Sequence, residues 1–166
     1  MFELNSVPKA KENYKATQNA CKLCSPLGAS VAYKGFKGCV PLIHGSHGCA
    51  TYIRRYLISH YKEPIDIASS YFTEDATIFG GDENFKMAVL NIINQYKPEI
   101  IGIASTCLSE TIGDDVSLFL HHFLEKHPEI DTDFVMASTP SYHGKHIERF
   151  HEAVVCFVKH YAKQHL

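Results

Sequence analysis

Three cysteines of this chain lie in short segments of small, turn-forming residues. Cys24 opens CSPLGA, Cys49 closes HGSHGC, and Cys107 lies in STCLSE. Thiolates that hold an iron–sulfur cluster need backbone that can approach bulky inorganic sulfide, and small residues permit this approach. The three are far apart in the sequence, so only a folded domain could bring their thiols together. The pattern favours iron–sulfur chemistry over packing.

The other cysteines have contexts that favour different roles. Cys21 and Cys24 form a C-x-x-C pair, a spacing that can mark zinc or redox chemistry. A structural zinc site needs a second pair, which makes zinc the weaker interpretation. Cys39 and Cys156 stand among apolar residues and are expected to be small core residues.

The residues after Cys49 carry the pattern of a helix. Residues 50–61 read ATYIRRYLISHY, with Pro64 beyond them as the end signal. One helical face is predicted to hold Tyr52, Tyr56, Leu57 and His60. Cys49 would then lie at the helix N-terminus, where free N–H groups and the helix dipole favour a thiolate or an anionic cluster. The alternative is an ordinary buried cysteine beside a helix.

Composition bounds the class of protein. The chain has 166 residues, of which 45% are hydrophobic and 20% charged, as in a soluble domain with one core. A formal charge of −2 argues against electrostatic binding to nucleic acid or to an anionic membrane. Small-molecule or protein partners are expected instead.

The chain is predicted to be cytoplasmic. It contains no apolar run near the roughly 20 residues that span a bilayer, and its opening residues lack the apolar core of a signal peptide. In the cytoplasm, cysteines are expected as reduced thiols, metal ligands or core residues, not as disulfides.

Strand and helix patterns alternate along the chain. Residues 1–18 are polar and are predicted to form an extended arm, and residues 19–166 a single α/β domain. Strands are expected within 65–72, 99–106 and 133–139, and helices over 82–96 and 113–127. A final helix is expected near the C-terminus, where apolar residues recur at helical spacing: Ile147, Phe150, Val154, Phe157, Val158 and Tyr161. This alternation predicts a Rossmann-like three-layer sandwich with a parallel sheet.

Cys107 lies at the functional edge of this predicted sheet. It follows the nearly continuous apolar strand 99–106, and ligands of open α/β sheets bind outside the carboxyl ends of strands. The glycine-rich segments GFKGC and FGGDEN do not form a dinucleotide or P-loop motif, so nucleotide binding by this chain is not expected.

From about Asn19 to Phe157 the sequence resembles the nitrogenase component 1 family, most closely the N-terminal domain of its β-type subunits. The segments that carry the resemblance occur in the family's order: CSPLGA, IHGSHGCATYIRRYLISHYKEP, SSYFTEDATIFGG, STCLSETIGDD and TPSYHG.

The resemblance implies a set of cluster ligands. It assigns Cys24, Cys49 and Cys107 to one half of a P-cluster-type 8Fe-7S site shared with an α-type subunit, with a 4Fe-4S cluster as the alternative. Ser141 matches a serine that can bind the oxidised cluster, although a turn serine after proline is an ordinary feature. Three thiolates leave a cubane cluster incomplete, so a half-site requires a partner. No catalytic residue is assigned to this chain.

Further roles follow from the same resemblance. Gly45, Ser46 and Gly48 are candidate second-shell donors to cluster sulfur. Tyr52 matches a tyrosine between the electron relay and the cofactor side, and packing at an interface would suit it equally. Phe79 matches a position where a separate ATP-dependent iron protein docks, whereas a core phenylalanine is the commoner fate.

Three interpretations compete. The first is an electron-relay domain of a nitrogenase or nitrogenase-like reductase, with tetrapyrrole reductases as a more distant enzyme alternative. The second is a scaffold subunit for assembly of the iron-molybdenum cofactor, and the third is a structural domain without a cluster. Family β-type subunits are much longer than this chain, so it could be a truncation or a short paralogue. It is not expected to be active alone, and a homo-oligomer is an option for the isolated chain.

Overall fold

A four-stranded parallel sheet forms the centre of the protein. The computed structural model describes residues 23–164, so the predicted arm 1–18 and Cys21 lie outside the described residues. The strand order is β2-β1-β3-β4. The strands are β1 (Cys39–His44), β2 (Ala68–Ser69), β3 (Ile100–Ser105) and β4 (Asp133–Ala137).

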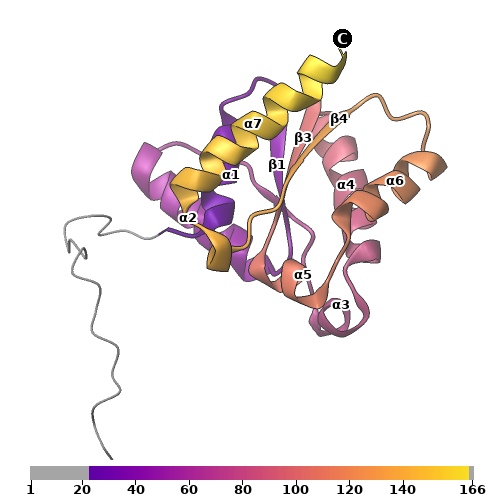
Figure 1. The fold of residues 1–166 in the computed structure, drawn as a ribbon, viewed down its shortest axis with the longest axis horizontal. Helices are drawn as coiled ribbons and strands as arrows, with labels where there is room; N and C mark the ends of the chain where they lie inside the picture. Colours follow the sequence, from indigo (N-terminus) through magenta and orange to yellow (C-terminus); the bar gives the residue numbers. More distant parts are fainter. Residues whose placement is uncertain (1–22, 165–166) are drawn as a thin grey trace, which may run out of the picture.

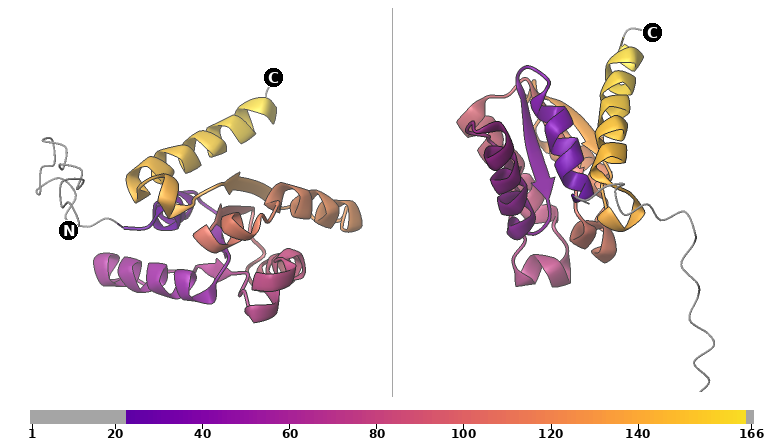
Figure 2. Two further views of the ribbon diagram at one scale, coloured as in Figure 1. Left: turned by 60° about the horizontal axis from the view of Figure 1, so that its bottom comes forward. Right: turned by 90° about the vertical axis from the view of Figure 1, so that its left-hand side faces the viewer.

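Helices cover both faces of this sheet, which gives three layers (Figures 1 and 2). One face carries α1 (Ser25–Lys34), α2 (His47–Tyr61) and α7 (His146–Gln164), and the other carries α4 (Asp82–Tyr96) and α6 (Val116–Lys126). Three short elements lie in the connections after β2, β3 and β4, respectively: α3 (Glu74–Phe79), α5 (Cys107–Ile112) and the 3-10 turn η1 (Ser141–His143). The predicted α/β sandwich with a parallel sheet is confirmed.

Two hydrophobic cores arise from the alternation of side chains along the strands. In β3, Ile100 and Ala104 face α1, α2 and α7, whereas Ile101 and Ile103 face α4 and α6. Every residue of β3 is buried, as expected for a strand covered on both faces.

Close packing of α1 on α7 joins the two ends of the described chain. A Cβ added at Gly28 would lie 1.8 Å from the carbonyl oxygen of His146, so only glycine allows the helices to approach this closely. Beyond α1, the ring of Phe36 stacks on that of Phe157 with centroids 3.5 Å apart. On the sheet side of α1, the buried Tyr33 donates its hydroxyl hydrogen to the carbonyl oxygen of Ile103.

The helices predicted over 82–96 and 113–127 and the strands predicted within 99–106 and 133–139 are all present as α4, α6, β3 and β4. The segment 65–72 contributes only the two-residue strand β2. Among residues 23–164, no helix is long and apolar enough to cross a lipid bilayer.

The buried faces of α2 and α7 are narrower than their sequence patterns indicated. In α2, Ala50, Ile53 and Leu57 are buried, whereas Tyr52 and Tyr56 are exposed. Of the residues that the sequence placed on one helical face, Tyr52, Tyr56, Leu57 and His60, only Leu57 is buried. In α7 the same holds, since several of its predicted stripe residues are exposed: Ile147, Phe150 and Val158.

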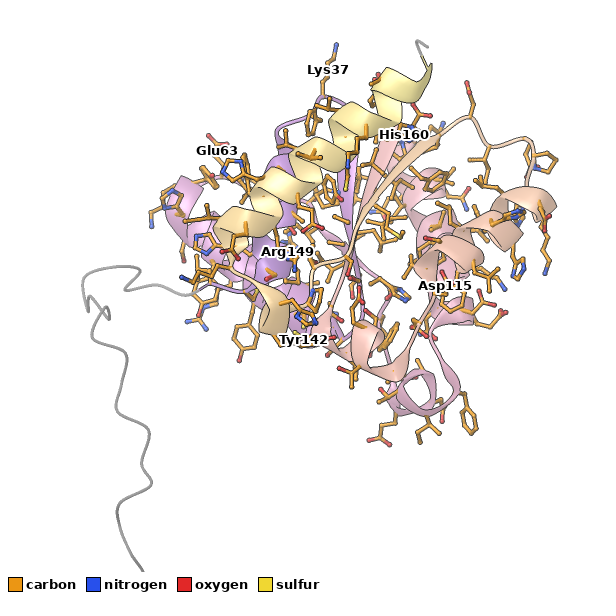
Figure 3. The ribbon with its side chains drawn as sticks, viewed as in Figure 1. Lys37, Glu63, Asp115, Tyr142, Arg149 and His160 are labelled. Carbon is orange, nitrogen blue, oxygen red and sulfur yellow. The ribbon has the colours of Figure 1, made fainter. Side chains whose placement is uncertain are left out.

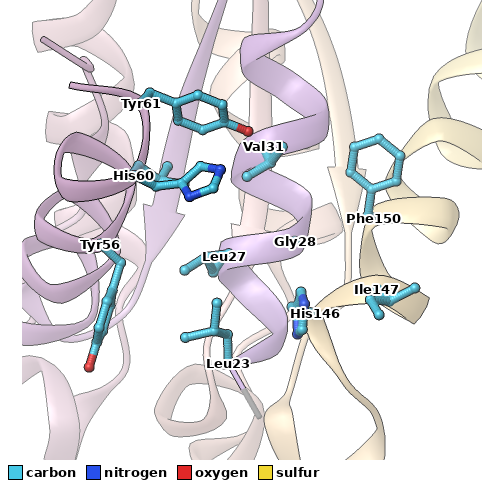
Figure 4. A pocket seen from close by; sticks show the side chains of 11 residues that line it. Leu23, Leu27, Gly28, Val31, Tyr56, His60, Tyr61, His146, Ile147 and Phe150 are labelled. Atoms are coloured by element: carbon cyan, nitrogen blue, oxygen red, sulfur yellow. The ribbon is translucent and has the colours of Figure 1, made fainter. Parts of the chain in front are cut away.

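An apolar groove of about 510 Å³ runs between α2, α1 and α7. Figure 4 shows α1 at its centre, with Tyr56 and His60 of α2 on one side and Ile147 and Phe150 of α7 on the other. The groove accounts for the exposure of Tyr56 and Tyr61 in α2 and of Ile147 and Phe150 in α7.

Candidate metal centre

The three predicted ligand cysteines lie at the starts of three different helices. Cys24 is the N-cap residue of α1, Cys49 lies in the first turn of α2, and Cys107 is the first residue of α5. The helices α2 and α5 directly follow the carboxyl ends of β1 and β3, so Cys49 and Cys107 share the edge that the sequence predicted to be functional.

Local hydrogen bonds fix the turn that carries Cys49. The Ser46 hydroxyl caps α2 by accepting from the Gly48 N–H, and the Cys49 N–H donates to the Ser46 carbonyl oxygen at 3.1 Å. Gly45 has φ +148°, and a Cβ there would lie 1.9 Å from Oγ1 of Thr106. The glycine therefore lets the Cys49 turn pack directly on the residue that precedes Cys107.

Ser141 connects the segments that carry Cys24 and Cys107. Its N–H donates to Sγ of Cys107 at 3.2 Å, and its hydroxyl oxygen accepts from the N–H of Ser25 at 3.0 Å. Ser25 in turn donates its hydroxyl hydrogen to the carbonyl oxygen of Gly144. The exposed Tyr142, labelled in Figure 3, marks this edge of the molecule. Ser141 thus lies next to Cys107, and its role as a cluster ligand stays a prediction.

The electrostatics of the thiols also indicate that they are neighbours. Desolvation raises the pKa of Cys49 above its ordinary value, and the nearby Cys24 and Cys107 thiolates raise it further. Desolvation, and to a smaller degree the Cys107 thiolate, also raises the pKa of Cys24. Without a cation Cys24 and Cys49 therefore favour the protonated form, and the helix N-terminus does not reverse this effect for Cys49. Iron would relieve the repulsion by binding in place of protons.

The three thiols come from three separate segments of the chain. Within residues 23–164, no group of three His, Cys, Asp or Glu side chains is close enough to hold one metal ion. A cluster is larger, and its iron atoms can each take one thiolate from a separate segment. Cys24 is exposed while Cys49 and Cys107 are half-buried, so the three thiols form an open site.

Gly45, Ser46 and Gly48, the predicted donors to cluster sulfur, have hydrogen-bond partners inside the chain. The Gly45 N–H donates to the Ser70 hydroxyl at 2.9 Å, and the Gly48 N–H donates to Ser46. These contacts shape the Cys49 turn, whereas donation to cluster sulfur by Gly45, Ser46 or Gly48 stays a prediction.

Tyr52 and Phe79 are both exposed. Tyr52 lies on α2 with 60% of its surface accessible. Phe79 ends α3, is 85% accessible, and stands beside Ile78, which is 72% accessible. A core position for Phe79 is therefore wrong, and the end of α3 forms an apolar projection.

Two residues that the sequence did not single out form a buried polar pair at the same edge. Nε2 of His44, the last residue of β1, lies 3.1 Å from Oδ2 of Asp114, and both side chains are almost fully buried. The signal for His44 was a polar residue at the end of the apolar segment VPLIH, next to the cysteine motif.

The model of the family described as "Nitrogenase component 1 type Oxidoreductase" matches residues 24–165, so the chain belongs to this family.

Individual relatives fall into two groups. The chain is 42% identical to the nitrogenase molybdenum-iron protein beta chain of Clostridium pasteurianum, over 89% of this chain and 32% of that protein. It is 40% identical to the nitrogenase iron-molybdenum cofactor biosynthesis protein NifN of a Nostoc species, over 89% of this chain and 33% of that protein. A solved structure titled "Nitrogenase Cp1 at pH 6.5" matches with a TM-score of 0.80 and 41% identity, over 95% of this chain and 35% of that one. The chain thus spans about a third of these relatives' length.

Proposed function

We propose that the domain supplies half of an iron–sulfur cluster site, of the P-cluster or 4Fe-4S type, at the interface with an α-type subunit. Cys24, Cys49 and Cys107 would hold the iron, and Ser141 would stand beside Cys107 as a further oxygen ligand. When bound, the cluster would accept and pass on single electrons. The observation that carries the proposal is the convergence of three thiols from separate helices onto one open edge.

An open half-site suits a shared cluster. Three thiolates cannot complete a cubane or a double cubane, so ligands from a second chain must close the site. The exposure of Cys24 leaves room for such a partner. Homo-oligomerisation is the alternative for the chain without its α-type partner.

The apolar end of α3 is proposed as the docking surface for an ATP-dependent iron protein. Phe79 and Ile78 are among the most exposed large apolar side chains of the described residues, and exposed aromatic residues are enriched at protein interfaces. Electrons would then enter the domain next to the thiol edge.

A scaffold for iron-molybdenum cofactor assembly is the second candidate function. The NifN relative matches as much of this chain as the beta chain relative does, and at similar identity. A scaffold would need the same fold and a cluster edge, but it would release its metal group instead of reducing a substrate.

The test is iron and sulfide content, with electron paramagnetic resonance, of anaerobically purified chain co-expressed with an α-type subunit. Cys49→Ala should lose cluster iron. Cys156→Ala removes a thiol of α7 and should keep it, which makes it the matched control. Turnover with the iron protein would then identify an electron relay, whereas transfer of the cofactor to an apo-enzyme would identify a scaffold. Equal, negligible iron in wild type and both variants would contradict the proposal and leave a structural domain.

A further inference from the structure

The buried pair of His44 and Asp114 lies between the thiol edge and the exposed end of α3. His44 has no accessible surface, and the side chain of Asp114 is 4% accessible. Rings surround the imidazole edge to face: Phe72 at 4.9 Å, Phe85 at 5.4 Å and Phe119 at 6.2 Å between centroids. A polar pair in such an apolar enclosure is costly unless it is well hydrogen bonded, so its position requires an explanation.

Asp114 connects the histidine to the turn after α3. Both carboxylate oxygens accept from the Gly81 N–H at 3.2 Å, while Oδ2 also lies within reach of His44 Nε2. Gly81 stands two residues after Phe79. A Cβ at Gly81 would lie 2.3 Å from Cζ of Phe72 and 2.6 Å from Oδ2 of Asp114, so the turn is packed tightly against the pair.

His44 is bonded on its other side to the cysteine segments. Its carbonyl oxygen accepts from the N–H of Thr106, the residue directly before Cys107. The chain that follows His44 forms the Gly45 turn and enters α2 with Cys49. The backbone of His44 therefore joins the two cysteine segments, and its ring contacts the Asp114 carboxylate that holds the turn after α3.

The hydrogen-bond pattern fixes the form of the imidazole. Nδ1 of His44 is buried without a hydrogen-bond partner among the described residues, so a proton there would be an unpaired buried donor. The neutral ring with its hydrogen on Nε2, donated to Asp114, satisfies the geometry.

We propose that His44 and Asp114 are positioning residues that hold the Phe79 turn in a fixed place relative to Cys49 and Cys107. This role rests on the proposed function, in which Phe79 is the docking residue and the three cysteines are the cluster ligands. Both side chains are almost fully buried, so the proposed effect of the pair on the cluster site and the docking surface is indirect. The pair keeps the distance between the docking surface and the thiols constant.

The test compares amide hydrogen exchange of the full chain and of two variants. His44→Phe keeps an aromatic ring in the aromatic enclosure but removes the donor, and should raise exchange of the Gly81 amide about tenfold, the loss expected for one hydrogen bond. Amides of β3 should keep their wild-type exchange. Thr77→Val is the matched control, because it removes a hydrogen bond within α3, to the Thr73 carbonyl, and should leave Gly81 unchanged.

Unchanged exchange at Gly81, or an equal rise at Gly81 and in β3, would overturn the positioning role. Asp114→Asn serves as the second variant if His44→Phe does not fold, and should give a smaller local rise. Iron-protein-dependent reduction of the co-expressed complex separates the two proposals. Local release at Gly81 with slower reduction and unchanged iron content supports both proposals, whereas local release with unchanged reduction supports positioning and removes docking from the proposed function.

Discussion

The carboxyl edge of the sheet has two polar regions that are built in opposite ways. The thiol region of Cys24, Cys49 and Cys107 is open, and its sulfur atoms repel one another as thiolates. The pair of His44 and Asp114 is closed, and the Asp114 carboxylate is held by His44 and by the Gly81 N–H. The open region has unused bonding capacity, which suits a group from outside the chain. The closed region can only orient its neighbours.

The largest expected effect concerns the helix that carries Cys24. Gly28→Ala would press a methyl group into the backbone of His146 and should lower the free energy of unfolding by about 3 kcal/mol, as overpacking does. Gly48→Ala is the control, since a Cβ there would approach only the Ser46 hydroxyl, at 3.7 Å. Urea unfolding of both variants measures the difference, and equal stabilities would show that the α1–α7 contact is looser than described.

The second largest expected effect concerns the buried pair of His44 and Asp114. Asp114→Ala leaves the N–H groups of His44 and Gly81 buried without an acceptor and should cost about 2 kcal/mol of stability. Asp115→Ala, one residue further on, removes only the side-chain cap that accepts from Leu118 and should cost about 1 kcal/mol. Thermal unfolding of the two variants tests this order. A larger loss for Asp115→Ala would mean that the pair does not stabilise the fold.

The closed region should also respond to pH. Burial lowers the pKa of His44 below its ordinary value, against the opposing effect of the Asp114 hydrogen bond. The unfolded chain then binds the extra proton more readily than the folded one. The contribution of His44 to stability is therefore complete above the ordinary pKa of about 6.5 and is lost as pH falls below it, by at most about 1.4 kcal/mol per pH unit.

Subtracting the stability profile of His44→Phe from that of the wild type isolates this contribution from the other histidines. The difference should shrink between pH 7 and pH 5. A difference that grows on acidification would indicate that the ion pair with Asp114 outweighs the desolvation of His44.

The smallest expected effect concerns the mutual repulsion of the open thiols. Cys107→Ser removes a group that, as a thiolate, raises the pKa of Cys49, so at alkaline pH, where the thiols ionise, alkylation of Cys49 in the iron-free chain should become on the order of twofold faster. Cys156→Ser should leave the Cys49 rate unchanged. Mass spectrometry of iodoacetamide adducts measures both rates, and equal rates would place Cys107 further from Cys49 than the structure does.

The helices and strands with strong periodic patterns could be predicted from the sequence. Other elements could not, and the reason differs from one element to the next. The continuous apolar run of β3 and the stripe of α4 are unambiguous in sequence. β1 was not predicted, since Pro41 argues against a central strand, yet it pairs in register opposite Gly102. The helices α3 and α5 have six residues each, too few for a helical period to show.

The candidate site was predictable in its residue types but not in its internal contacts. The three cysteines stood out because of their glycine and serine surroundings. The hydrogen bond from Ser141 to Cys107 depends on where β4 ends relative to β3, which no local pattern specifies. The pairing of His44 with Asp114 likewise joins residues 70 positions apart in the sequence.

The hydrogen bond between Ser25 and Ser141 has a consequence for the order of biosynthesis. It joins positions 116 residues apart, and α1, whose N-cap is Cys24, packs closely against α7. Contacts of such long range form late, after the loop between them has been closed. A ribosome-bound chain that has not yet released α7 would expose its cysteines without assembling them. Metal delivery to the three cysteines would therefore have to follow the release and packing of α7.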